Sequence, residues 1–338
     1  MKKVTMIELS RSIGNKNFTL GVLYLFYPNG QQYQKDKPIR ALKKILSRFE
    51  CTKYIIYINN AAGSDFLQKI SENEFEISGD NSHMEFSGWQ KGIDFSKKNN
   101  LPCDAYLFVN DMFLHDSFFH RRLVNQAVLE CALDHQAMVG SQRRLPVSGK
   151  IMGNDIIPYV RTHLFIISKK IVDALGSLIS IDRQSMERFF IPYYDPAIYL
   201  FRENAPISQN VKDFIFFYLT STWYRKKPYK PQNFEILRNK ALSLLNAFLL
   251  SIRVRQLDYP LISYSKTKFF LSQAFSADQI NQVWFKESEN NSRAPAELVN
   301  KFWLKKTPPY RHLPKKKPSF TWENFKNLLE RYPSFDHL

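Results

Sequence analysis

Polar side chains follow three apolar segments of the sequence, and side chains of these types can hydrogen-bond to ligands. Tyr27-Pro28-Asn29 ends the first segment, Asn59-Asn60 ends the second with Asp65 shortly after it, and Asn110-Asp111 ends the third. Amide and carboxylate groups hydrogen-bond to sugar and base groups, and carboxylates also bind Mg²⁺ or Mn²⁺. A single turn of this kind is common in loops without any function. Three turns at matching positions favour a shared binding site.

The apolar segments themselves have the composition of strands buried on both faces. Segments with helical spacing of apolar residues lie between them. This alternation predicts an α/β fold, with a mostly parallel sheet and helices on both of its faces. The carboxyl ends of such strands meet at one edge of the sheet, where ligands bind. The predicted strands are residues 20–27, 54–58, 105–109, 137–140 and 164–167, and the predicted helices begin near residues 39, 82, 123 and 169.

The segment Ser82-His83-Met84-Glu85 has the S-x-x-E spacing of a capping box, which predicts a helix that begins at Ser82. Phe86, Trp89 and Ile93 then fall on one face of this helix. Because the N-terminus of a helix attracts anions, the start of this helix is a candidate for binding phosphate groups.

The pattern changes after about residue 185, and further helices are predicted at residues 211–223 and 234–256. We therefore expect an α/β domain at residues 1–205 and a helical, basic region at residues 206–338. The formal net charge is +17, and residues 221–320 hold 19 Lys and Arg against 6 Asp and Glu. Such a region is either an ordinary solvated surface or a face that contacts polyanions, such as phospholipid headgroups, phosphate-bearing saccharide lipids or nucleic acid.

Composition narrows the class of protein. Hydrophobic residues make up 44% of the chain, which is enough for a large core. The three cysteines form no CxxC pair, so a reducing compartment is expected rather than a disulfide scaffold. No secretory signal is recognisable, and the most apolar segment, residues 241–254, is shorter than the roughly 20 residues of a membrane-spanning helix.

The order of the polar turns resembles that of a known family. The chain is similar to nucleotide-sugar-dependent glycosyltransferases of the GT-A type, close to the family-2 group of bacterial O-antigen and capsule assembly. In that group a first strand ends in a Pro-Tyr-Asn-like turn, as at Tyr27-Pro28-Asn29, and a second ends in Asp-Asp-x-Ser-x-Asp, as at residues 59–65. Residues 79–92 match its Asn-x-Gly helix, residues 106–112 its Asp-x-Asp strand and residues 159–168 its acceptor-side strand.

The resemblance, over about residues 18–180, implies a GT-A (Rossmann-like) fold. It implies transfer of a sugar, a hexose or deoxyhexose, from a nucleotide-sugar donor to a hydroxyl of a saccharide or lipid-linked saccharide acceptor in surface polysaccharide biosynthesis. The residues that it implies for the donor site are Tyr27, Pro28, Asn29, Asn59, Asn60, Asp65, Asp80, Asn81, Trp89, Asn110 and Asp111.

Two departures from the family pattern concern the donor and the metal ion. Asn59-Asn60 stands where the family has an acidic pair, and amides can still bind the base and ribose. Met112 stands near the place of a second metal-binding carboxylate, which leaves Asp111 as the predicted ligand for Mg²⁺ or Mn²⁺. Phosphate oxygens and water would have to complete the coordination, so metal-assisted and metal-free sites both stay open.

A carboxylate must take the proton of the acceptor hydroxyl if the sugar is transferred with inversion. Beside Asp111, the predicted candidates are Asp182 and Glu187, followed by Asp195 and Asp155. His163, on an apolar strand, is interpreted as a core histidine. The spacing of His83, His115, His120 and His163 is not that of a zinc site.

The predicted location is the cytoplasmic face of the cell membrane, with peripheral attachment through the basic region and the apolar stretch Ala241 to Leu250. Two other function classes remain as alternatives. A nucleic-acid-binding protein fits the basic region and its neighbouring aromatics, although no such motif occurs and no nucleic-acid partner is expected. A non-catalytic assembly subunit with a degenerate transferase core fits the departures at Asn59-Asn60 and Met112.

Overall fold

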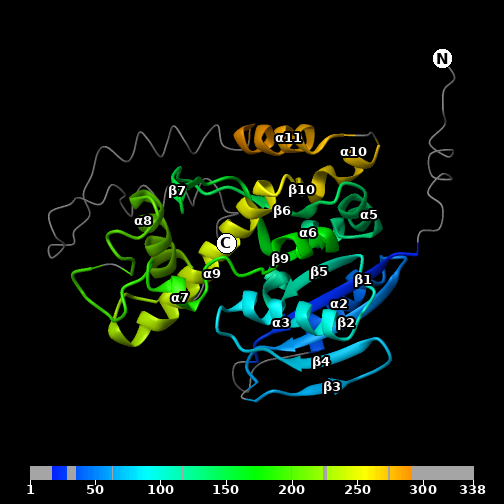
Figure 1. Cartoon of the computed structure of the whole chain (residues 1–338), viewed down its shortest axis with the longest axis horizontal. Coiled ribbons are helices and arrows are strands. Elements are labelled where there is room, and N and C mark those ends of the chain that lie inside the picture. Colours follow the sequence, from blue (N-terminus) through cyan, green and yellow to red (C-terminus); the bar gives the residue numbers. More distant parts are fainter. Residues whose placement is uncertain are drawn as a thin grey trace.

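The computed structural model of the chain describes residues 17–28, 36–62, 64–115, 118–198, 200–223, 227–272 and 275–290. A mixed sheet with helices around it forms the centre of this part (Figure 1). Its strands are β1 (Thr19–Phe26), β2 (Thr52–Asn59), β3 (Leu67–Lys69), β4 (Glu74–Ser78), β5 (Ala105–Asn110), β6 (Met138–Arg143), β9 (Tyr159–Ser168) and β10 (Leu261–Ser263). A separate pair is formed by β7 (Lys150–Ile151) and β8 (Asn154–Asp155).

The sheet is mostly parallel, as the sequence predicts. The strand order is β10-β6-β9-β5-β1-β2-β4-β3. Parallel pairing joins β5, β1, β2 and β4, and β10 pairs in parallel with β6. Only β9, which lies between β5 and β6, and β3 at the edge run in the opposite direction among the strands described.

Helices cover both faces of the sheet, and β1 shows why. Along this strand, Leu20, Val22 and Tyr24 pack in one core cluster, whereas Leu23 and Leu25 pack in another. Successive side chains of a strand point to opposite faces, so a continuous apolar run needs cover on both sides. The helices in the described ranges are α2 (Asp36–Leu46), α3 (Glu85–Lys98), α4 (Phe118–Leu123), α5 (Gln126–Asp134), α6 (Lys169–Leu175), α7 (Arg183–Met186), α8 (Gln209–Phe217), α9 (Phe234–Gln256), α10 (Thr267–Leu271) and α11 (Ala277–Asn290).

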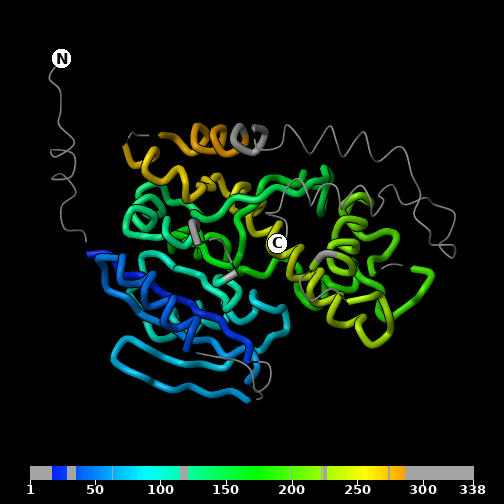
Figure 2. Tube along the Cα trace, turned by 180° about the vertical axis from the view of Figure 1, so that it is seen from behind, coloured from blue at the N-terminus to red at the C-terminus, as the bar shows by residue number. Residues whose placement is uncertain are grey.

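Residues after the predicted division at 205 complete the sheet and its cover. The predicted helix 234–256 is confirmed as α9, which lies between the sheet and the part of the chain that contains α7 and α8 (Figures 1 and 2). Asn246 of α9 accepts hydrogen bonds from the backbone of Ser180 and Ile181, and Ser251 accepts one from Val160. The next strand, β10, joins β6. Residues of the two predicted regions therefore pack in the same core clusters.

The apolar stretch Ala241 to Leu250 has a different role from the one predicted for it. Ala241, Leu242, Leu245 and Leu250 of α9 are almost completely buried in the core clusters. These side chains cannot enter a membrane while the protein is folded, so the prediction that this stretch helps attachment is wrong. None of the helices in the described ranges is both long and apolar enough to cross a bilayer.

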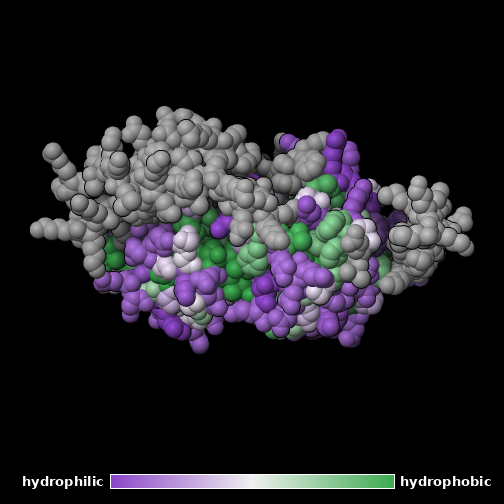
Figure 3. Space-filling view, turned by 90° about the horizontal axis from the view of Figure 1, so that it is seen from above, coloured by the Kyte–Doolittle hydropathy of each residue, from purple (hydrophilic) through white to green (hydrophobic). Residues whose placement is uncertain are grey.

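Much of the predicted basic surface lies beyond the part of the chain that the structure describes. Figure 3 shows mainly hydrophilic side chains on one face of the described part, with apolar ones gathered near its middle. The helical structure predicted for the basic C-terminal tail stays a prediction. The basic residues concerned are Arg225, Lys226, Lys305, Lys306, Arg311 and Lys315–Lys317.

The predicted capping box is wrong. Helix α3 begins at Glu85, not at Ser82, and Met84 precedes it with a positive φ of 56° and no side-chain cap. The backbone N–H of Ser82 donates instead to Asp80, 2.9 Å away. Asp80 accepts the hydrogen bond from the backbone N–H of Ser82 that Glu85 would accept in a capping box. The side chain of Glu85 therefore does not turn back to Ser82.

Candidate functional site

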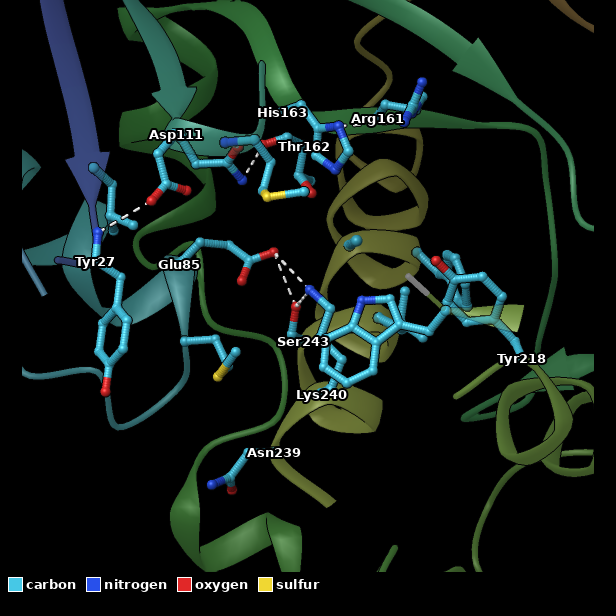
Figure 4. Close-up of a pocket in the computed structure, with 18 of the residues that line it drawn as sticks. Tyr27, Glu85, Asp111, Arg161, Thr162, His163, Tyr218, Asn239, Lys240 and Ser243 are labelled. Carbon is cyan, nitrogen blue, oxygen red and sulfur yellow. Dashed lines mark hydrogen bonds and ion pairs between the residues drawn. The ribbon is translucent and has the colours of Figure 1, made fainter. Parts of the chain in front are cut away.

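A cavity of about 420 Å³ lies at the carboxyl ends of β1, β2 and β5 (Figure 4). Tyr27, Asn60 and Asp111 line it on the side of the sheet. Its opposite wall comes from α8, the π-helix Tyr218–Thr222 and the first half of α9. The cavity is therefore built by residues from both regions predicted from the sequence.

The topology of the sheet accounts for this position. From β1 the chain proceeds to β2 on one side, whereas β5 lies on the other side of β1. The order of the strands reverses here, and a crevice opens outside the carboxyl ends at such a switch point. The backbone N–H of Tyr27, just after β1, donates to Oδ2 of Asp111, just after β5, at 3.3 Å. This contact joins the two strand ends across the switch point.

Asn110 fixes the direction in which Asp111 leaves β5. Its Oδ1 accepts a hydrogen bond from the backbone N–H of Met112 at 3.1 Å, and its Nδ2 donates to the carbonyl of Thr162 on β9 at 3.5 Å. The first bond is an Asx turn, which favours the short 3₁₀ helix Asp111–His115. Asp111 consequently projects toward Tyr27 at the edge of the cavity (Figure 4).

Asn60 organises the loop beside the cavity. Its Nδ2 donates to Oδ1 of Asn81 at 2.7 Å and to the carbonyl of Met84 at 3.0 Å, while its Oδ1 accepts from the N–H of Asn81. A Cβ at Gly79 would lie 2.2 Å from Oδ1 of Asn60, so only glycine permits this close approach. Both amide protons of Asn60 are used within the protein, which leaves only the second lone pair of its oxygen to meet a ligand.

Glu85, the first residue of α3, contributes a buried carboxylate that the sequence did not identify as a site residue. Its Oε1 accepts a hydrogen bond from Oγ of Ser243 on α9 at 2.9 Å and lies 3.9 Å from Nζ of Lys240. Figure 4 shows Glu85 between Asp111 and Tyr27 on one side and these two α9 residues on the other. The Ser-x-x-Glu spacing predicts Glu85 as part of a helix cap and does not predict it as a residue of a binding or catalytic site.

Basic side chains share the cavity with the two carboxylates. Lys240, Arg161 and His163 all line it. Nη2 of Arg161 lies 3.2 Å from Nδ1 of His163. His163 is half-buried in this wall, so its interpretation as a core histidine is wrong. A cavity with carboxylates and cations suits a ligand that carries both hydroxyl groups and negative charge.

The far wall of the cavity is aromatic. Tyr218 begins the π-helix, and its ring stacks with that of Phe214 at a centroid distance of 6.2 Å. Tyr159 and Phe248 meet edge to face at 4.8 Å, and burial raises the pKa of Tyr159. π-Helices are rare and are frequent at functional sites. Rings in a cavity wall provide a flat apolar surface against which a pyranose ring can pack.

Five residues predicted for the donor site line the cavity: Tyr27, Asn60, Asn81, Asn110 and Asp111. Pro28 and Asn59 are next to it in the chain without lining it. Asn29 lies outside the described residues.

Three other residues predicted for the donor site are not brought to the cavity. The exposed Asp65 pairs with Lys91 and accepts a hydrogen bond from Ser78, which hold the pKa of its carboxyl below the usual value. Asp80 accepts hydrogen bonds from the backbone and hydroxyl of Ser82.

Trp89, the third of them, is 0% exposed and packs among aromatic rings of the core. Its centroid lies 5.6 Å from that of Phe108 and 5.5 Å from that of Phe165, both in edge-to-face contact. No ligand can reach this side chain without unfolding of the core. The structure therefore gives Trp89 a packing role where the resemblance implied contact with the donor.

The predicted catalytic carboxylates Asp182 and Glu187 also lie away from the cavity. Asp182 caps α7 by accepting a hydrogen bond from the N–H of Ser185 at 2.7 Å, and this bond lowers the pKa of its carboxyl. A lowered pKa is unfavourable for a base that must take a proton near neutral pH. Glu187 is exposed after the same helix. Asp155 and Asp195 do not line the cavity, and the side chains of His115 and His120 lie outside the described part.

A divalent cation at Asp111 would have few protein ligands. Within the described ranges, no three His, Cys, Asp or Glu side chains gather closely enough to hold a metal ion. Glu85, the other carboxylate of the cavity, already accepts the hydroxyl of Ser243. Phosphate oxygens of a substrate and water molecules would therefore have to provide most of the coordination.

No family model, no curated protein and no solved structure matches the chain. The function must therefore be argued from the geometry of the cavity and from the residues that line it.

Proposed function

We propose that the protein is a glycosyltransferase, which transfers a sugar from a nucleotide-sugar donor to a hydroxyl of a saccharide or lipid-linked saccharide acceptor. The observation that carries the proposal is the meeting of the strand ends of β1, β2 and β5 at one cavity. The position is the one at which open α/β sheets bind nucleotides. The contact between Tyr27 and Asp111 places a carboxylate at this point.

The two sides of the cavity suit two different substrates. On the sheet side, Tyr27, Asn60 and Asp111 offer a ring and hydrogen-bonding oxygens for a nucleoside and its sugar. On the side of α8 and α9, the nearly buried Tyr218 and Phe248 belong to an apolar wall beside which an acceptor sugar would lie. Glu85 lies between the two sides and supplies a carboxylate where an acceptor hydroxyl would be deprotonated.

A thermal-shift screen with UDP-, GDP-, dTDP- and CMP-sugars, each with and without Mn²⁺, tests the proposal. A donor at about 100 times its Kd stabilises the folded protein by about 2.7 kcal/mol, so one member of the panel should raise the melting temperature. Comparison of the paired samples shows whether Mn²⁺ contributes. If no nucleotide sugar raises the melting temperature, the proposal is wrong.

Two variants connect any shift to the cavity. Asp111→Ala should abolish it, because the carboxylate at the switch point is lost. The control is Asp155→Asn, which changes an exposed carboxylate that pairs with Lys150 outside the cavity. This control should keep the full shift. A shift that survives in Asp111→Ala would place the nucleotide elsewhere.

A non-catalytic assembly subunit is a second candidate, favoured by one observation. Where the resembled family has an acidic pair, Asn60 uses both amide protons to hold Asn81 and Met84 in place. Such a residue can preserve the shape of a nucleotide site without supporting turnover. Binding of a nucleotide sugar without transfer or hydrolysis across a panel of saccharide and lipid-linked acceptors would favour this candidate.

A further inference from the structure

Lys240 and Glu85 form a loose charged contact in the cavity wall. Nζ of Lys240 is 3.9 Å from Oε1 of Glu85 and 3.3 Å from Oγ of Ser243. By contrast, Oγ of Ser243 donates to the same Oε1 at 2.9 Å. The serine therefore holds the carboxylate closely, while the ammonium group stands off near the limit of an ion pair.

The backbone beneath Lys240 is fixed. Asn246, further along α9, accepts hydrogen bonds from the backbone of Ser180 and Ile181 at 2.8 and 2.9 Å. Ser243, less than one turn away from Lys240, is buried against Glu85. Any rearrangement is therefore confined to the flexible four-carbon side chain of Lys240, which keeps 20% of its surface exposed, against 10% for Glu85.

A diphosphate is a stronger partner for Lys240 than Glu85 is. It carries more negative charge than one carboxylate and offers several oxygen acceptors to the three protons of an ammonium group. The strand ends at Tyr27 and Asp111 would hold the nucleoside and sugar of a donor across the cavity from α9. The diphosphate between them would then come within reach of a lysine on the opposite wall.

We propose that Lys240 leaves Glu85 when the donor binds and pairs with its diphosphate, and that this exchange frees Glu85 to act as the base. The proposal rests on the proposed glycosyltransferase function. It assigns to the same cavity a phosphate-binding lysine and a catalytic carboxylate that no sequence motif marks. Ser243 keeps its hydrogen bond to Glu85 throughout, so the carboxylate stays oriented after the lysine has moved.

The transfer step needs only the donor, the acceptor and these two side chains of the cavity. The acceptor oxygen forms a bond to the anomeric carbon of the donor sugar, and the bond from that carbon to the phosphate oxygen breaks. The electron pair of the broken bond leaves with the nucleoside diphosphate, whose added charge Lys240 neutralises. The proton of the acceptor hydroxyl passes to the Glu85 carboxylate and is later released to water.

Binding measurements on variants of the full chain test this exchange. The probes are UDP, GDP and dTDP, with uridine, guanosine and thymidine as phosphate-free counterparts, measured by isothermal titration calorimetry. Lys240→Met should weaken binding of the diphosphate at least about tenfold and leave binding of the nucleoside unchanged. Lys240→Arg keeps the charge and should recover much of the loss. Lys230→Met, an exposed lysine outside the cavity, is the matched control and should bind as the wild type does.

Glu85→Gln separates the two roles. The amide oxygen of this variant can still accept the hydroxyl of Ser243, but the neutral side chain neither pairs with Lys240 nor takes a proton. We expect unchanged or tighter binding of the diphosphate and a loss of transfer of at least about 100-fold. Each variant is checked for a melting temperature near that of the wild type, so that unfolding does not imitate a loss of binding.

The outcomes that contradict the exchange are distinct from failure of the proposed function. A wild-type protein that binds none of the three diphosphates overturns the exchange, and it overturns the proposed function as well only if CMP-sugars also fail to raise the melting temperature. Binding by the wild type with undiminished binding by Lys240→Met overturns the exchange alone. Weakening by Glu85→Gln as large as that by Lys240→Met also overturns it, because the two side chains would then bind the ligand jointly.

Discussion

The backbone N–H of Tyr27 donates a hydrogen bond to Oδ2 of Asp111 across 84 positions of sequence, at 3.3 Å. The bond joins the carboxyl ends of β1 and β5, which are neighbours in the sheet. It holds the side chain of Asp111 at the edge of the cavity, on the side of the strand ends, while Tyr27 stays 40% exposed. Position and exposure together make these two residues the best-placed contacts for a donor.

Asp111→Asn should separate the structural role of Asp111 from its chemical role. The amide oxygen of the substituted side chain can still accept the hydrogen bond from Tyr27, so we expect the melting temperature to stay within about 3 °C of the wild type. The negative charge at the strand end is lost, and transfer should fall by about 100-fold or more. Differential scanning fluorimetry and a transfer assay with the donor identified by the screen measure the two effects. Full activity in this variant would remove Asp111 from the site.

The strand ends were predictable because the signal is local. Apolar runs such as Leu20 to Phe26 predict strands buried on both faces. The residues that follow such a run must lie at the carboxyl end of the strand. The same reasoning missed β4, whose apolar residues Phe75 and Ile77 alternate with Glu74 and Glu76. That alternation is the period of a half-buried strand, so the signal was present but shorter.

Trp89→Ala should destabilise the protein without a specific effect on ligands. The side chain is 0% exposed and fills the core beside Phe108 and Phe165, so its removal leaves a large cavity. Loss of a buried tryptophan costs about 3–5 kcal/mol of the free energy of unfolding. Urea denaturation, with the linear extrapolation to water, measures this loss.

Tyr27→Ala is the counterpart of Trp89→Ala at the cavity. Tyr27 is 40% exposed, so the free energy of unfolding should change by less than about 1 kcal/mol, while affinity for the nucleotide sugar falls. The reverse pattern, a stable Trp89→Ala with selectively weakened binding, would restore Trp89 to the donor site.

The placement of Trp89 and Glu85 could not be predicted because it depends on contacts distant in sequence. Helical spacing puts Trp89 on one face of α3, but only the position of β5 and β9 shows that this face is the core. Glu85 meets Ser243 across 158 positions. A pattern read within one segment cannot show which other segment packs against it. Site residues that come from two elements therefore appear only once the fold is known.

The burial of His83 predicts that the free energy of unfolding depends on pH. His83 is 7% exposed, its Nδ1 lies 2.9 Å from Oγ of Ser82, and its Nε2 has no hydrogen-bond partner among the described residues. Burial lowers the pKa of His83, although the nearby Asp80 pulls in the opposite direction, and Arg183 and Asp182 act more weakly. The neutral form is therefore favoured in the folded state.

The direction of this pH dependence follows from proton uptake by His83 in the unfolded chain. Below the unfolded-state pKa of about 6.5, the unfolded chain binds a proton at His83 more readily than the folded protein does. Stability from this group is present above that pH and is lost as the pH falls toward the folded-state pKa. Urea denaturation at about pH 7.5 and about pH 5 should show a larger loss for the wild type than for His83→Asn. Equal losses would mean that His83 titrates alike in both states.

Burial of the apolar face of α9 sharpens the expectation for membrane attachment. Since Leu242, Leu245 and Leu250 pack in the core, this stretch offers no apolar anchor, and the expected attachment is through charge. Each Lys or Arg close to an anionic surface contributes about 1 kcal/mol, so a small group of the basic residues is enough for reversible binding. Peripheral association with the cytoplasmic face of the membrane stays a prediction.

Flotation with liposomes tests whether charge alone drives this association. The protein should float with vesicles of phosphatidylglycerol and phosphatidylcholine at low salt, and not with phosphatidylcholine alone. At 1 M salt the Debye length falls to about 3 Å from about 8 Å at physiological strength, so binding should disappear almost completely. A variant with serine at Lys315, Lys316 and Lys317 should bind more weakly at low salt, by up to about 3 kcal/mol. Binding that persists at 1 M salt would require an apolar contact, which α9 cannot supply while the protein is folded.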